Sequence, residues 1–321
     1  MRSCGTAPRY SRTVQQRTTT LTSRAEVREL LRIRRPLSTL PHATAMQTVQ
    51  HEDGVLVRSF TLVPPDGEPV PCLYLTPDAP GPRPGVVAVH QHNAEFHLGK
   101  SEPAGLAGDS SLAYGIVLAR LGAAVLVPDL RGFEERRRPR PDGTGEQLDA
   151  FHLLTVGTTL QARHVEDVAL CVTWLVDQGC DAVGIIGHSL GGQVAFFAAA
   201  CDERLRAAVI SCGLATVASF ARAGVLHNAA WYVPDLVAAG DCAAVAAVTS
   251  GQSFWVSAGD DDPLFPPSGV REAVGGFPEG AAVLRTFAGP HSLPPELMAE
   301  ASHWLISILA LGDRDPEPRP S

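Results

Sequence analysis

Six short, continuously apolar runs constrain the fold of this chain most strongly. A strand covered on both faces of its sheet is apolar throughout, whereas a half-exposed strand alternates between apolar and polar residues. Segments with helical spacing separate the runs, and this alternation predicts a doubly wound, mostly parallel twisted sheet with helices on both faces. The expected strands are residues 85–90, 123–128, 182–186, 207–211, 253–258 and 282–287, and the expected helices are residues 25–33, 107–121, 161–178, 192–200, 270–275 and 295–311.

An antiparallel hairpin is expected before this parallel unit. Residues 55–63 and 70–75 are apolar runs on either side of the turn sequence Pro64-Pro65-Asp66-Gly67. We interpret residues 23–311 as one domain, since no internal repeat is visible. Residues 1–22 are expected to form a disordered extension, with a targeting segment as the alternative, and the charged, proline-rich residues 312–321 a flexible tail.

Charge and cysteine content exclude several classes of function. The 321 residues carry a formal net charge of −8, so no basic field is available for nucleic acid or an anionic membrane surface. The seven cysteines form no C-x-x-C pair, which fits neither a disulfide framework nor a zinc site. No apolar stretch approaches the roughly 20 residues of a membrane span. We therefore expect a cytoplasmic protein, and a homodimer is compatible with this composition.

The sequence Gly187-His188-Ser189-Leu190-Gly191 connects an expected strand directly to an expected helix. A serine hydroxyl is a weak nucleophile at neutral pH, so an enzyme must expose it and place a base beside it. The G-x-S-x-G pattern holds the serine on a sharp, strained turn, and its small residues let the strand and helix approach closely. Ser189 is therefore the candidate nucleophile. The alternative is a small-residue turn in which Ser189 only caps the helix.

An acid and a histidine follow Ser189 in chain order, each after its own expected strand. Asp260, Asp261 and Asp262 follow residues 253–258, and His291 follows residues 282–287. His291 would take the proton of Ser189 and return it to the leaving group, while an aspartate would fix the histidine tautomer. Taken singly, a solvated acidic turn and a loop histidine are the alternatives. Their order and their positions at strand ends favour the triad.

These residues resemble the α/β-hydrolase superfamily, and more narrowly its dienelactone hydrolase-like branch of serine esterases. The resemblance runs from about residue 55 to residue 311, and its specific segments are LGKSEPAGL at 98–106 and PDLRGFEER at 128–136. The chain departs from dienelactone hydrolase itself by carrying Ser189 where that enzyme has a cysteine. The resemblance implies the α/β-hydrolase fold, and it favours Asp262 as the triad acid, with Asp261 as the alternative.

An oxyanion hole needs two backbone N–H donors. One is expected from Leu190, directly after the nucleophile, and the other from Gln91 or His92 in the loop after the first parallel strand. The pair His90 and His92 could also indicate a metal. Because no carboxylate or cysteine ligand accompanies these histidines in the sequence, we expect no metal and no cofactor.

Residues 212–252, before the acid-bearing strand, are expected to form a short lid insert. From this insert, His227, Trp231 and Tyr232 are candidates for the substrate pocket wall, with ordinary core packing as the alternative for the two aromatic residues. Residues Phe133, Glu134 and Arg136 would border the same mouth. The basic run 136–140 could attract a substrate carboxylate, or it could be a solvated loop.

The sequence thus predicts a serine hydrolase that cleaves a carboxylic ester, lactone or thioester of a small or medium molecule through an acyl-enzyme. Two alternatives stay open. The same triad could transfer the acyl group to an internal hydroxyl or amine, as an acyltransferase or cyclase does. The chain could also be a non-catalytic, hydrolase-like binding protein.

Overall fold

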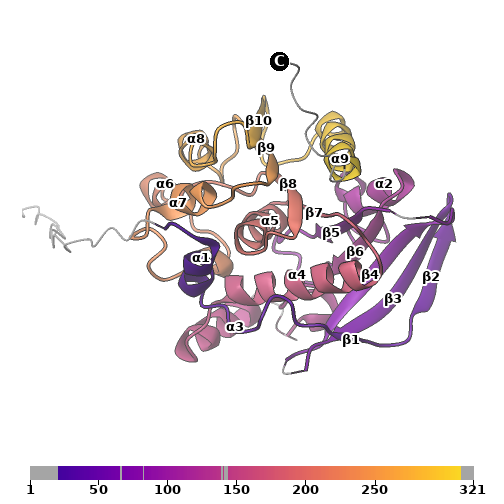
Figure 1. The fold of residues 1–321 in the computed structure, drawn as a ribbon. Coiled ribbons are helices and arrows are strands. Elements are labelled where there is room, and N and C mark those ends of the chain that lie inside the picture. The colour runs from indigo at the N-terminus through magenta and orange to yellow at the C-terminus, as the bar shows by residue number, and fades with distance from the viewer. Residues whose placement is uncertain (1–20, 66, 82, 139, 141–143, 312–321) are drawn as a thin grey trace, which may run out of the picture.

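A computed structural model describes residues 21–65, 67–81, 83–138, 140 and 144–311 (Figure 1). Ten strands form one sheet in the order β1-β3-β4-β6-β5-β7-β8-β9-β10, with β2 also paired to β3. The pairs from β6 to β10 are parallel, and those among β1, β2, β3, β4 and β6 are antiparallel. The strands are β1 (His42–Ala43), β2 (Gln47–Glu52), β3 (Val55–Val63), β4 (Val70–Pro77), β5 (Gly85–Val89), β6 (Ala124–Pro128), β7 (Val183–His188), β8 (Leu205–Ser211), β9 (Ser253–Gly259) and β10 (Ala282–Phe287).

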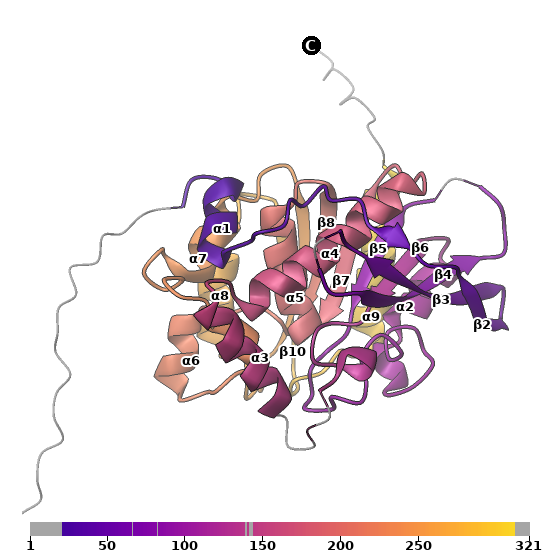
Figure 2. The same cartoon turned by 90° about the horizontal axis from the view of Figure 1, so that it is seen from below.

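Helices cover both faces of the sheet, and each face has its own apolar core. The helices α1, α4 and α5 lie on one face, and α2 and α9 on the other (Figures 1 and 2). The α-helices are α1 (Arg24–Leu31), α2 (Tyr114–Arg120), α3 (Thr144–Thr155), α4 (Leu160–Asp177), α5 (Leu190–Cys201), α6 (Val217–Ala223), α7 (Asp241–Ala247), α8 (Pro267–Val274) and α9 (Pro295–Ala310). Short 3-10 helices are η1 (Ser110–Leu112), η2 (Glu134–Arg136) and η3 (Ala229–Trp231).

The mostly parallel sheet with an antiparallel entry is the architecture that the sequence predicts. Every residue of β5, β6 and β7 is buried, as expected of strands covered on both faces. By contrast, β3 alternates between buried and partly buried residues because helices cover only part of it. The continuous apolar runs therefore identified the central strands correctly.

Several elements are absent from the sequence prediction. Strand β2 (QTVQHE) is largely polar and pairs only with β3, so it has no apolar signature. Helix α3 buries Glu146 and Asp149 beside Ala150 and Leu153, and these buried acids disguise its amphipathic pattern. The expected helix over residues 107–121 is shorter and divided into η1 and α2. The insert 212–252 contains α6, η3 and α7, which pack against α8, α3, α4 and α5.

The boundaries of the folded unit differ slightly from the prediction. Leu21, assigned to the extension, is buried in the larger core, and the Thr22 hydroxyl donates to Glu26 in α1. Ser23 caps α1 by accepting a hydrogen bond from the Glu26 amide. Residues 21 and 22 thus belong to the domain. The rest of the expected extension, residues 1–20, and the expected tail, 312–321, lie outside the described residues.

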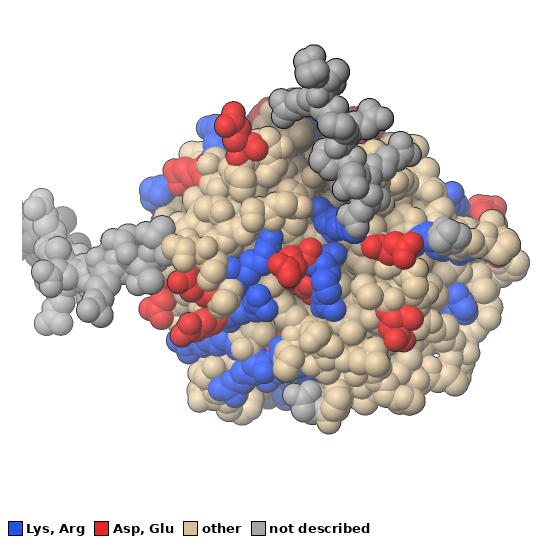
Figure 3. Space-filling view, in the orientation of Figure 1, with Lys and Arg blue, Asp and Glu red and all other residues tan. Residues whose placement is uncertain are grey.

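Basic and acidic side chains are interspersed on the molecular face seen in Figure 3. Among the described residues, several such side chains form ion pairs, for example Arg204 with Asp202. Within the described part of the chain, none of the helices combines the length and apolarity that crossing a bilayer requires.

Candidate active site

Ser189 lies between β7 and α5 in a strained backbone conformation, with φ 54° and ψ −117°. A non-glycine residue adopts positive φ only where the surrounding structure enforces it. Here the enforcement is close packing, because a Cβ atom on Gly191 would lie 2.0 Å from the carbonyl oxygen of Val89. The amide of Ser189 also donates to the carbonyl of Ser211 in β8, at 2.8 Å. The turn thus has the geometry that the G-x-S-x-G pattern predicts.

The loops after β9 and β10 bring an acid and a histidine together. Asp262 Oδ2 lies 2.8 Å from His291 Nδ1, and Asp262 Oδ1 accepts the backbone amides of Leu264 and Phe265 at 2.8 and 3.1 Å. Burial acts to raise the pKa of Asp262, but the hydrogen bonds from His291 and the two amides hold it below its usual value. The carboxylate is therefore ionised at neutral pH.

The two neighbouring aspartates are arranged differently. Asp260 and Asp261 are both exposed, whereas the side chain of Asp262 is fully buried. Of the three carboxylates, only that of Asp262 is hydrogen-bonded to His291 among the described contacts. The structure therefore pairs the histidine with the aspartate that the sequence analysis favoured.

His291 is held between two other rings. The ring of Phe265 stacks on it at 5.5 Å with an interplanar angle of 6°, and the ring of His188 lies 4.9 Å away. Burial lowers the pKa of His188 to about 3, so this neighbour stays neutral. With Nδ1 bonded to Asp262, the other ring nitrogen, Nε2, is buried and has no hydrogen-bond partner among the described residues. In a neutral ring with its proton on Nδ1, Nε2 can accept a hydrogen bond.

Hydrogen bonds of His90 hold the loop after β5 in place. Its Nδ1 donates to the carbonyl of Gln91 at 2.7 Å, and its Nε2 accepts the amide of Leu130 at 3.1 Å. Both bonds require the neutral ring, and burial lowers the pKa of His90 to about 4. The loop then turns through Asn93 and Ala94, both at positive φ. Leu190, the residue after Ser189, is the first residue of α5, so its amide has no partner within the helix.

One pocket of about 780 Å³ collects most of these groups. Ser189, His291, Gln91 and His92 all line it, as do His227 and Tyr232 from the insert. It opens at the carboxyl ends of the parallel strands, where ligands bind in sheets of this kind. The remaining lining residues are Asn93, Ala94, Phe96, Glu146, Gln147, Phe151, Leu226, Asn228, Ala229 and Leu264.

Four residues predicted for the pocket do not line it. Trp231 is buried against Phe220 and Phe197, so core packing accounts for it. Phe133 is also buried, and its ring lies behind the pocket, 5.3 Å from the rings of Phe96 and His92.

The other two residues are Glu134 and Arg136. Both are held in ion pairs, partly buried for Glu134 and buried for Arg136. Arg136 donates to Asp167 at 2.5 Å and is only 5% exposed in its side chain. Opposite charges hold these groups inside the protein, so Arg136 offers no guanidinium to a substrate in the pocket.

Glu134 belongs to a charge cluster around Lys100, the only lysine of the chain. The ammonium lies 2.7 Å from Glu134, 2.7 Å from Glu135 and 3.4 Å from Asp129. Burial acts to lower the pKa of Lys100, but the carboxylates raise it above its usual value. The two sequence segments that carry the finer resemblance, 98–106 and 128–136, therefore meet at this cluster.

Sequence reasoning missed the contribution of α3 and of Phe96 to the pocket. Glu146, Gln147 and Phe151 come from α3, and Phe151 is 63% exposed at the rim. A signal was present, because Leu148, Phe151 and Leu154 recur at helical spacing just after the arginine-rich loop.

Three potential metal ligands gather at the triad. Donor atoms of Cys212, Asp262 and His291 lie within 4.8 Å of one another. Asp262 and His291 are bonded to each other, and burial raises the pKa of the Cys212 thiol to about 12. The thiol is thus protonated at neutral pH, whereas the thiolate is the form that binds a metal. His90 and His92, the pair singled out in the sequence, are engaged with Leu130 and Glu146.

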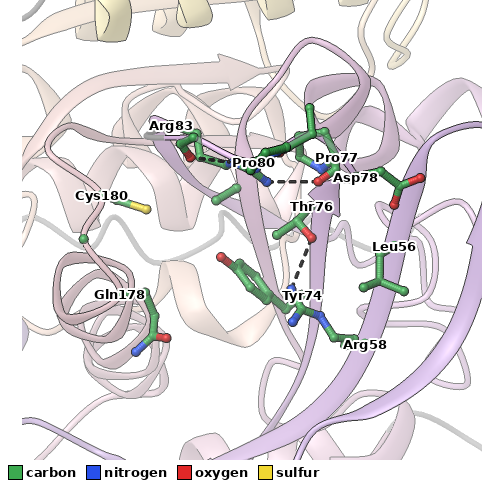
Figure 4. A pocket seen from close by; sticks show the side chains of 14 residues that line it. Leu56, Arg58, Tyr74, Thr76, Pro77, Asp78, Pro80, Arg83, Gln178 and Cys180 are labelled. Carbon is green, nitrogen blue, oxygen red and sulfur yellow. Dashed lines mark hydrogen bonds between the residues drawn. The ribbon is translucent and has the colours of Figure 1, made fainter.

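A second hollow, of about 450 Å³, lies at the opposite ends of the strands (Figure 4). There Arg58 lies over the ring of Tyr74 and donates to Thr76, while Arg83 donates to the carbonyl of Pro77. Cys180 is its one candidate nucleophile among the lining residues, and burial raises its thiol pKa to about 11. A thiol that remains protonated at neutral pH is a poor nucleophile.

Sheet order, elbow and site together define the α/β-hydrolase fold. The model of the family described as "alpha/beta hydrolase fold" matches residues 103–247. The resemblance seen in the sequence is therefore confirmed at the level of the fold.

Individual relatives agree with this assignment. The chain is 26% identical over 246 residues to a protein of Bacillus subtilis (strain 168) whose printed name is "Putative hydrolase YtaP". The aligned region covers 74% of this chain and 78% of that protein. Among solved structures, a cold-adapted esterase from an Arctic intertidal metagenomic library superposes with a TM-score of 0.59 at 18% identity, over 82% of this chain and 99% of that one. Acetyl xylan esterase 1 from Thermoanaerobacterium sp. JW/SL YS485 gives a TM-score of 0.63 at 15% identity, over 93% and 99%.

Proposed function

We propose that this protein is a serine hydrolase that cleaves a carboxylic ester, lactone or thioester of a small or medium molecule through an acyl-enzyme. The observation that carries the proposal is the bond between Asp262 and His291 at a pocket that Ser189 also lines. The likeness to proteins named as esterases supports the same chemistry, and the segments around Lys100 and Asp129 support the finer resemblance to the dienelactone hydrolase-like branch.

The first half of the proposed mechanism follows from the histidine tautomer. Since Asp262 is ionised, it accepts a hydrogen bond from Nδ1–H of His291, which leaves Nε2 without a proton. Nε2 takes the proton of Ser189 as the serine oxygen attacks the substrate carbonyl. The negative charge then forms on the carbonyl oxygen, where the amides of Leu190 and of Gln91 or His92 stabilise it.

In the second half, the protonated His291 donates its proton to the leaving alcohol or thiol, and an acyl-enzyme forms on Ser189. A water molecule then gives a proton to His291 and attacks the acyl carbonyl. Collapse of this second intermediate releases the carboxylic acid and returns the proton to Ser189. Asp262 stays ionised throughout and stabilises the imidazolium in both halves.

Labelling with a fluorophosphonate probe, together with hydrolysis of 4-nitrophenyl acetate, tests the proposal. We expect the probe to label the wild type and the Ser307→Ala control, whose serine is exposed on α9, but not Ser189→Ala. For Ser189→Ala and His291→Ala, kcat should fall by about 10³ to 10⁶. Equal labelling of the wild type and Ser189→Ala would contradict the proposal, because another residue would then react with the probe. No labelling and no hydrolysis by the wild type would also contradict it and would favour a binding protein.

A further inference from the structure

The active-site pocket contains a single formally charged side chain among its lining residues. Glu146 on α3 lines the pocket, while no lysine or arginine does so. Its side chain is only 4% exposed. A carboxylate this deeply buried is strongly destabilised unless hydrogen-bond donors or a positive charge compensate it.

Only one oxygen of this carboxylate has a partner. His92 Nδ1 accepts the amide of Ala94 at 3.0 Å, so in the neutral ring Nε2 carries the proton and donates it to Glu146 Oε2, also at 3.0 Å. The second oxygen, Oε1, is shielded from solvent and accepts no hydrogen bond from any described residue. Glu146 thus lines the same pocket as Ser189, and one of its two carboxylate oxygens lacks a hydrogen-bond partner.

The nearby arginines do not neutralise this charge. Arg136 is paired with Asp167, and Arg138 is paired with Asp149, which lies one turn after Glu146 on α3. The surroundings of the pocket thus disfavour a substrate carboxylate, which was one of the two possibilities raised for the basic run 136–140. They favour a group that brings its own positive charge and N–H donors.

Aromatic rings in the same lining suit a cation as well. Phe96, Phe151 and Tyr232 line the pocket together with Glu146. The faces of such rings attract ammonium groups, and the attraction increases where water is excluded. A carboxylate with an unpaired oxygen in a pocket lined by aromatic rings is a combination that recognises an ammonium group better than a hydroxyl or a methyl group.

We propose that Glu146 is the specificity-determining residue of an ammonium subsite, and that the substrate is an ester or thioester carrying a protonated amine. This inference rests on the proposed function, because the amine binds beside Ser189 while the ester is cleaved there. The amine takes no part in the chemistry. It donates a charge-assisted hydrogen bond to the carboxylate of Glu146 and thereby positions the acyl carbonyl.

Four 4-nitrophenyl esters of equal chain length test the subsite. They end in an ammonium (6-aminohexanoate), a methyl (heptanoate), a hydroxyl (6-hydroxyhexanoate) or a carboxylate (hydrogen adipate), and the series is repeated with two more methylenes. We expect kcat/KM for the ammonium ester to exceed that for the methyl ester by about tenfold or more in at least one series. The carboxylate ester should be the poorest substrate.

Glu146→Gln keeps an oxygen for His92 and removes the charge. This variant should lose the preference for the ammonium ester, so that kcat/KM for the ammonium ester falls by at least about tenfold more than kcat/KM for the methyl ester. Glu95→Gln removes the same charge from a residue that does not line the pocket, and it should keep the preference. An equal loss for all four esters in Glu146→Gln would mean that Glu146 only positions the oxyanion loop through His92, and would overturn the proposal.

A binding measurement separates this proposal from the proposed function. In Ser189→Ala, calorimetry should detect binding of hexylammonium but not of 1-hexanol, and Glu146→Gln in the same background should abolish it. Cleavage of the methyl ester without any preference for the ammonium ester, or equal binding of both probes, refutes the subsite and leaves the hydrolase intact. If the wild type shows neither hydrolysis nor labelling, the proposed hydrolase function is refuted. The subsite is still tested in that case, because hexylammonium either binds in a Glu146-dependent way, which supports it, or does not, which refutes it.

Discussion

Replacing Asp262 by asparagine removes one negative charge from the site and preserves the shape of the side chain. The amide oxygen of asparagine can still accept the backbone N–H groups of Leu264 and Phe265, as Oδ1 does now at 2.8 and 3.1 Å. The amide nitrogen would then face Nδ1 of His291. Because this nitrogen is a donor, Nδ1 must become the acceptor, and the imidazole proton moves to Nε2.

The wrong tautomer is what disables the enzyme. With a proton on Nε2, His291 cannot take the proton of Ser189, and no charged partner stabilises an imidazolium. We expect kcat to fall by about 10⁴, close to 5 kcal/mol of transition-state stabilisation. Stability should change much less, because two of the three hydrogen bonds at this side chain remain. The one bond that is lost is the charge-assisted bond between Asp262 and His291, which is worth about 1.5 to 3 kcal/mol.

Kinetics with a 4-nitrophenyl ester and thermal unfolding of the same samples check this prediction. Asp260→Asn and Asp261→Asn are matched controls, since both aspartates are exposed on the same turn. Each should stay within about threefold of the wild-type kcat. If Asp262→Asn is nearly as active as wild type while Asp261→Asn is inactive, the assignment of the acid is wrong.

Two further predictions concern stability. Gly191→Ala should destabilise the fold by at least about 3 kcal/mol in urea unfolding, because its Cβ would meet backbone atoms that cannot move aside. Gly275→Ala is the control, since Gly275 has a φ of −63°. Equal stability of the two variants would contradict the argument. Burial lowers the pKa of His164 from 6.5 to about 3, so below pH 6.5 the unfolded chain binds a proton that the folded protein does not. Relative to His164→Gln, wild type should therefore lose about 1.4 kcal/mol of unfolding free energy per pH unit between pH 6 and 4, and parallel pH curves would contradict this.

Local patterns in the sequence were sufficient for the central sheet and for the order of the candidate triad. Continuous apolar runs identify β5 to β9 because a strand buried on both faces has no polar side to show. The elbow is equally local, since Gly187, Ser189 and Gly191 stand within five residues. Strand ends then indicate where His291 must lie, because parallel strands all end at one edge of the sheet.

The pocket wall was predicted poorly because distant segments form it. Helix α3 was missed because its buried acids interrupt the apolar pattern. Trp231 and Tyr232 are adjacent in sequence, yet one is in the core and the other at the rim. The arginine-rich sequence around Arg136 is typical of an exposed, charged loop. Its ion-pair partner, Asp167, lies thirty-one residues away, so no local pattern indicates the pairing.

By itself, the sequence determined the sheet, the turn that carries Ser189, and the three residue types needed for acyl transfer, since each depends on neighbours along the chain. Tertiary structure alone decided which aspartate meets His291, which aromatic residues line the pocket, and that Glu146 lines it with one carboxylate oxygen unpaired. These choices depend on how side chains from separate segments are oriented and desolvated. Such orientation and burial arise only when the segments pack together.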